Sequence, residues 1–73
     1  MPRTTLFDEI NRRAEALVDA GLHTADIGRC WIYLNDRHLP LTGLRHDASW
    51  IWDRVRDRVE EIRGEWDEIE VAA

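Results

Sequence analysis

Apolar residues recur at alternating spacings of four and three over the last third of this 73-residue chain. Such an a/d heptad repeat places all its members on one stripe only if the segment is a helix. We therefore expect a long amphipathic helix from about Asp47, a good capping residue, to Ile69 or Val71. Gly64 falls opposite the stripe, where it costs about 1 kcal/mol of helix propensity and could mark a kink or an early end. The stripe consists of Ala48, Trp52, Val55, Val59, Ile62, Trp66 and Ile69.

A shorter amphipathic helix is predicted over residues 5–20, after the capping candidates Thr4 and Thr5. Gly21 predicts a left-handed end for this helix, with Leu22 folding back on Leu17. The inward side is expected to carry Phe7, Ile10, Ala14, Leu17 and Val18. The opposite, solvated side is expected to carry Arg12, Arg13, Glu15 and Asp19.

Residues 22–43 allow two interpretations. One is a helix capped by Thr24, with Pro40 beyond its end. The other is a hairpin with strands near 29–34 and 38–42, in which Pro40 restricts the second strand to a sheet edge. We favour the helix, because the capping signal at Thr24 is specific. Its inward residues would be Ile27, Cys30, Trp31 and Leu34.

These elements predict an all-α fold, with residues 1–73 forming a single small three-helix domain. In this arrangement the first and last helices pack antiparallel, and the middle segment closes the core. The alternative is an α+β fold in which a helix, a β-hairpin and a helix follow one another.

Length and composition bound the class of protein. A chain of this length supports one small core. Its single cysteine, Cys30, cannot form an internal disulfide and fits a reducing compartment. No apolar run approaches the roughly 20 residues of a membrane span, and no leader precedes a cleavage site. We therefore expect a cytoplasmic protein that does not bind membranes.

No group of residues predicts catalysis. Cys30 has no histidine at a helical i,i+4 spacing, and its spacing from His23, His38 and His46 matches no zinc-site signature. The four glycines form no phosphate loop, and no carboxylate stands in an apolar stretch that would raise its pKa. We expect no enzyme, no metal and no cofactor.

The formal charge of −5 is unevenly distributed. Residues 1–44 hold five arginines against six acidic residues, a net of −1, and residues 45–73 hold five against nine, a net of −4. An acidic half disfavours phosphate binding and suits a basic protein partner, and large aromatics often anchor interfaces. The expected partner-binding residues lie on the outer side of the long helix, except Trp66, which belongs to the apolar stripe near its tip; they are Trp50, Arg54, Asp57, Glu60, Glu61, Trp66, Asp67 and Glu68.

Two tryptophans on the long helix raise separate questions. Trp50 lies opposite the apolar stripe, so it is either buried by the 22–43 segment or an interface anchor that stacks with Arg54. Trp66 would lie beyond the first helix, because residues 47–69 span about 34 Å and residues 5–20 only about 24 Å. We expect this tip to be a docking surface, rimmed by Glu65, Asp67, Glu68 and Glu70.

The predicted function is non-enzymatic protein binding by an inhibitor or adaptor. Its partner would be a basic protein, or a nucleoprotein complex whose nucleic-acid site it occupies. Phage-encoded inhibitors such as anti-CRISPR proteins are one class with this size and charge.

Two alternatives remain open. Residues 16–35 resemble a helix-turn-helix DNA-binding regulator, with Gly21 in the turn and Ile27 six residues later. Direct DNA binding is disfavoured, because this segment offers only Arg29, with Arg37 just beyond it, for phosphates. The second alternative is a structural homodimer. A parallel coil is disfavoured because it would oppose Arg58 to Arg63.

Overall fold

The computed structural model describes the backbone of residues 5–72 and the side chains of residues 5–64. It contains α1 (Leu6–Ala20), α2 (Ile27–Asp36) and α3 (Ala48–Ala72), and residues 5–72 form no strand. The all-α prediction is confirmed. The hairpin alternative is wrong, because residues 29–34 lie within α2 and residues 38–42 form an irregular connection. No helix in the described part of the chain is both long and apolar enough to cross a membrane.

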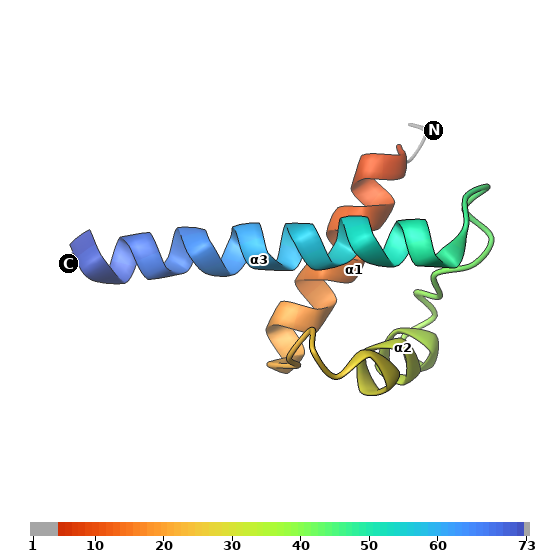
Figure 1. Ribbon diagram of the computed structural model, residues 1–73, viewed down its shortest axis with the longest axis horizontal. Helices are drawn as coiled ribbons and strands as arrows, with labels where there is room; N and C mark the ends of the chain where they lie inside the picture. The colour runs from red at the N-terminus through yellow and green to blue at the C-terminus, as the bar shows by residue number, and fades with distance from the viewer. Residues whose placement is uncertain (1–4, 73) are drawn as a thin grey trace.

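The other two helices, α1 and α2, lie beside the first half of α3 (Figure 1). Figure 1 shows α1 crossing α3 steeply, with α2 and the connection that follows it lying near the start of α3. The predicted antiparallel packing of α1 and α3 is therefore wrong. Arg58 donates to Asn11, and Arg63 donates to the carbonyl of Leu22, so the contact advances along both helices in the same sense. Trp31 of α2 meets Trp52 of the apolar stripe edge to face, with ring centroids 6.4 Å apart.

Both ends of α1 form as its sequence predicts. The Thr5 hydroxyl accepts from the Asp8 amide at 3.1 Å, and the Asp8 carboxylate accepts from the Thr5 amide at 3.2 Å. This capping box provides hydrogen-bond acceptors for two backbone amides that have no carbonyl partner within the helix. At the other end Gly21 has a φ of 70°, and the Leu22 amide donates to the Leu17 carbonyl at 3.1 Å.

Two residues of α1 lie on the opposite side from the one predicted. Phe7 is 63% exposed, although its neighbour Leu6 packs against the core, so it is Leu6 that faces inward at the start of α1. Arg13 is only 4% exposed, because the connection after α2 lies over it. Its Nε donates to the Pro40 carbonyl at 2.8 Å, and its guanidinium also donates to the Glu9 carbonyl at 2.9 Å. A guanidinium can be buried when carbonyls replace its water.

Helix α2 begins later than predicted. Asp26, not Thr24, caps it by accepting from the Arg29 amide, and residues 24–25 form a turn instead. Ile27, the first residue of α2, is 50% exposed, so its predicted inward position is wrong. The other predicted inward positions are confirmed, since Cys30 and Leu34 are fully buried and Trp31 packs against the core.

Helix α3 continues through Gly64 without a break. Its apolar stripe is buried as predicted from Trp52 to Ile62, whereas Ala48 is partly covered. The side chains of Trp66 and Ile69 lie outside the described residues. Ile51 is also fully buried, although the heptad pattern places it beside the stripe. Helix α3 has neighbours on two sides, α1 and α2, so it buries a wider sector than a coiled-coil seam does.

Candidate protein-binding surface

Trp50 lies on the exposed side of α3 and is 41% exposed. Its ring stacks on His46, with centroids 4.6 Å apart and an interplanar angle of 23°. The Arg54 guanidinium carbon lies 5.5 Å from the ring centroid, which confirms the predicted cation–π contact. Burial by the 22–43 segment, the other expectation for Trp50, is wrong. His46 and Arg54 thus both contact the Trp50 ring, and part of the ring stays exposed.

A continuous row of side chains extends from Trp50 along α3, and we call it the outer stripe. Its spacings of four, three, one and three residues keep it on one side of the helix. Arg54 pairs with Asp57 at 3.9 Å, and Arg58 pairs with Glu61 at 3.2 Å. The outer stripe therefore carries no net charge; the Arg54–Asp57 pair is exposed and weak, whereas Arg58 is half-buried. It consists of Trp50, Arg54, Asp57, Arg58 and Glu61.

The negative charge of α3 lies beyond the outer stripe. Residues 45–64 hold five arginines and five acidic residues, a net of zero, so the whole −4 of residues 45–73 comes from residues 65–73. Asp53 is paired with Arg56 at 3.5 Å. Glu60 is exposed and forms no ion pair among the described side chains. We call the carboxylates after the described side chains the acidic end; they belong to Glu65, Asp67, Glu68 and Glu70.

The structure divides the predicted partner-binding residues into three sets. Trp50, Arg54, Asp57 and Glu61 come together in the outer stripe. Glu60 lies about a quarter turn away from its neighbour Glu61, at 100° per residue. The third set has side chains outside the described residues and comprises Trp66, Asp67 and Glu68.

An open hollow of about 240 Å³ separates the outer stripe from α1. Phe7 and Ile10 form its apolar wall, and the charged residues of the outer stripe form the other. Arg58 reaches from that wall to Asn11, donating to its side-chain oxygen at 2.8 Å. No sequence signal indicated that Phe7 would belong to this surface, because its spacing matches a core position.

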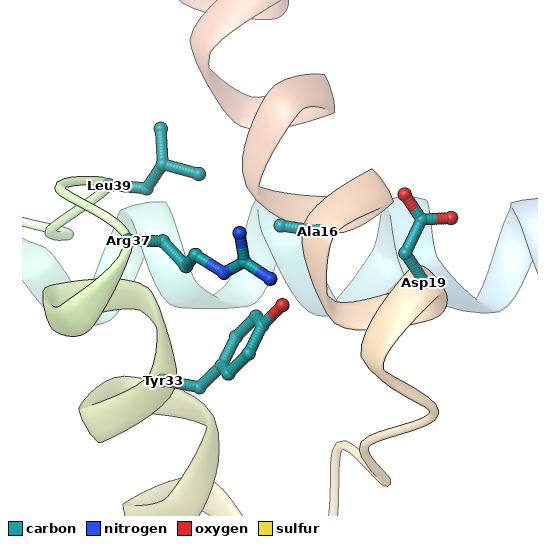
Figure 2. Close-up of a pocket in the computed structure, with 5 residues that line it drawn as sticks. All are labelled: Ala16, Asp19, Tyr33, Arg37 and Leu39. Atoms are coloured by element: carbon teal, nitrogen blue, oxygen red, sulfur yellow. The ribbon is translucent and has the colours of Figure 1, made fainter.

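A second hollow, of about 250 Å³, lies between α1 and α2 (Figure 2). Arg37 stacks over the Tyr33 ring with its guanidinium carbon 5.3 Å from the centroid. Figure 2 shows the Tyr33 hydroxyl and the Arg37 guanidinium side by side and facing Ala16, with the Asp19 carboxylate at the far edge. One cation and one carboxylate at opposite edges of a shallow hollow do not define a ligand.

The described side chains form no group of three that could hold a metal ion. Cys30 is buried, and its sulfur lies 3.4 Å from the His23 carbonyl. Burial raises the pKa of the Cys30 thiol, Asp26 raises it further, and Arg63 opposes the shift. A thiol that stays protonated at neutral pH is a poor nucleophile and a poor metal ligand.

The helix-turn-helix alternative has a helical counterpart in α1 and α2. Arg29 pairs with Asp26 at 3.4 Å, and Arg37 lies over Tyr33, so both cations of this segment already have a contact within the chain. Binding to phosphates would have to compete with these contacts.

No family model matches the chain, and no curated protein and no solved structure shows significant similarity to it.

Proposed function

We propose that this chain is a non-enzymatic protein-binding module, an inhibitor or adaptor that engages a basic protein surface through α3. The observation that carries the proposal is the charge distribution along α3. The first part of the helix carries no net charge, so the excess lies in the acidic end, and Glu60 adds an exposed carboxylate that forms no ion pair among the described side chains.

The position of this charge favours a cationic partner. The C-terminal end of a helix already bears a partial negative charge, so carboxylates there are unfavourable for the helix itself. Four acidic residues and no arginine in residues 65–73 therefore suit recognition more than stability. A basic protein, or the basic site of a nucleoprotein complex, would neutralise this end of the helix. An anti-CRISPR-type inhibitor would act in this way.

The test is binding of the full chain to a fluorescent nona-arginine peptide, measured by anisotropy at about 0.15 M salt. One variant combines Glu60→Gln, Asp67→Asn and Glu68→Gln. The matched control combines Glu15→Gln, Asp19→Asn and Asp36→Asn, which removes an equal number of negative charges, three, from α1 and α2.

We expect the first variant to bind at least about tenfold more weakly than the wild type, and the control to bind within about threefold of it. Equal loss in both variants would show that only net charge matters, and would refute a surface on α3. Tighter binding to random duplex DNA than to the peptide would favour the helix-turn-helix alternative.

A further inference from the structure

We propose that the end of α3 forms a short coiled coil with an amphipathic helix of the partner protein, a helix whose apolar side is flanked by lysine or arginine. This inference rests on the proposed function, to which it adds the form of the basic partner. It concerns residues 65–72, whose backbone continues α3 and whose sequence continues the heptad repeat.

The end of α3 extends past its neighbours in the chain. Arg63 donates to the carbonyl of Leu22, which lies just after the end of α1, so α1 leaves α3 near this point. Figure 1 shows no other segment of residues 5–72 beside the turns of α3 that follow Gly64. At 1.5 Å per residue, residues 65–72 add about 12 Å of helix without a neighbour.

The apolar stripe of α3 continues beyond the core. Val59 is fully buried and Ile62 is 8% exposed, so the chain itself covers the stripe this far. Trp66 and Ile69 follow Ile62 at the spacings of four and three that define the stripe. An amphipathic helix gains most of its stability by packing its apolar side against another element. A second helix laid on the end of α3 would complete the stripe.

The residues that flank the stripe change charge where α1 ends. With Trp66 at position a, the last flanking g and e positions beside α1 hold Arg58 and Arg63, and both donate to that part of the chain. The next g and e positions hold Glu65 and Glu70. Residues at these positions form ion pairs between helices and set the choice of partner in a coiled coil. Two glutamates therefore select a helix that carries lysine or arginine there.

The counter-charges for these glutamates have to come from outside α3. No arginine lies three or four residues from Glu65 or Glu70, so the helix provides neither an i,i+3 nor an i,i+4 partner. The outer stripe differs, because Arg54 and Asp57 pair within the helix. Basic residues at the flanking positions of a second helix would meet both glutamates.

The same charges argue against a second copy of this chain as the occupant. If two ends of α3 paired in parallel, Glu65 of each copy would face Glu70 of the other; in an antiparallel pair, each glutamate would face its own equivalent. Like charges placed opposite one another disfavour an interface. The rest of the stripe offers no alternative site, because it is buried in the core from Trp52 to Ile62.

The test is binding of the full chain to fluorescent three-heptad peptides, measured by anisotropy at about 0.15 M salt. The basic amphipathic peptide has leucine at a and d, lysine at e and g, and alanine or glutamine elsewhere. A scrambled peptide has the same composition without the heptad period, and an acidic peptide has glutamate in place of each lysine. We expect the basic amphipathic peptide to bind at least about tenfold more tightly than either of the others.

Two tryptophans of α3 provide a matched pair of variants. Trp66→Ala removes a tryptophan from the apolar stripe, and Trp50→Ala removes one from the outer side of the same helix. We expect Trp66→Ala to weaken binding of the basic amphipathic peptide at least about tenfold, because interfaces depend on central aromatic residues. Nona-arginine binding should stay within about threefold of wild type, since no charge is lost. Trp50→Ala should leave both affinities within about threefold.

A charge exchange tests the flanking positions separately. The double variant Glu65→Lys and Glu70→Lys should bind the acidic peptide more tightly than the basic amphipathic one, which reverses the wild-type preference. An unchanged preference would refute the assignment of these two residues. Far-UV circular dichroism of each variant checks that the helices remain.

The outcomes separate this inference from the proposed function. If the scrambled and basic amphipathic peptides bind equally, while nona-arginine binding still depends on Glu60, Asp67 and Glu68, the helical partner is refuted and the proposed function is not. If neither nona-arginine nor any of the peptides binds, the proposed function itself is refuted. A wild-type dimer in sedimentation velocity that Trp66→Ala dissociates would assign the stripe to a second copy and overturn the proposal.

Discussion

Arg13 and Arg12 form a natural pair for measuring what burial does to an arginine. Both lie within 3.6 Å of the Glu9 carboxylate, but the Arg13 side chain is 4% exposed and that of Arg12 is 58% exposed. Arg13 also donates to the Pro40 and Glu9 carbonyls. Burial lowers the pKa of Arg13 and Glu9 opposes the shift; the group remains charged at neutral pH.

We expect Arg13→Ala to destabilise the fold by about 2–4 kcal/mol. A hydrogen bond to a charged group contributes about 1.5–3 kcal/mol, and the loss of two such bonds is partly offset by the desolvation that alanine avoids. Arg12→Ala should cost at most about 0.5 kcal/mol, because exposed ion pairs contribute little. Arg13→Lys keeps the charge but should still cost more than about 1 kcal/mol, since one ammonium cannot reproduce the geometry of a guanidinium.

Urea unfolding followed by far-UV circular dichroism gives these differences from the shift of the midpoint. If Arg13→Ala is unfolded without urea, Arg13→Lys still provides the comparison with Arg12→Ala. Equal effects of the Arg12 and Arg13 substitutions would refute the reasoning, because they would show that the contact with Pro40 contributes no stability.

Two further outcomes are expected. Ile51→Val should lower the free energy of unfolding by about 0.5–1.5 kcal/mol in the same assay, because Ile51 is fully buried. Ile32→Val should be nearly neutral, because Ile32 is 64% exposed. The reverse order would contradict the packing of α3. Because the folded chain raises the pKa of Cys30, its contribution to stability is complete below the unfolded value of about 8.5 and is lost as pH rises through the folded value. Wild type should therefore lose more stability than Cys30→Ala between pH 8 and 10 in buffered urea titrations, and parallel losses would argue against the shift.

Local signals in the sequence were sufficient to predict that the helices form. The capping box at Thr5, the glycine after Ala20 and the heptad stripe of α3 each act within a few residues, so their outcome does not depend on the rest of the fold. The first residue of α2 was harder to predict, because Thr24 and Asp26 are both good capping residues. Only the turn at residues 24–25 decides between them.

Features that depend on contacts distant in sequence could not be predicted. The burial of Arg13 follows from how the connection after α2 packs, and the crossing of α1 over α3 and the exposure of Phe7 likewise depend on packing that helical spacing does not encode. The candidate surface shows the same limit. Trp50, Arg54, Asp57 and Glu61 were predicted, but Arg58 was not, and the sequence could not show that Arg54 and Arg58 would pair with Asp57 and Glu61 on the same stripe.

Three arginines link segments that are far apart in the sequence: Arg13 reaches the connection after α2, Arg58 reaches Asn11, and Arg63 reaches the carbonyl of Leu22. The chain contains no lysine, so every cation it has can act as a planar, multidentate donor. Around so small a core, these side chains tie the helices to one another and to the connections between them. Covalent modification of guanidinium groups, for instance by deimination to citrulline, should therefore loosen the tertiary structure as well as change the charge. Species with more modified arginines would have both a more negative net charge and a lower free energy of unfolding.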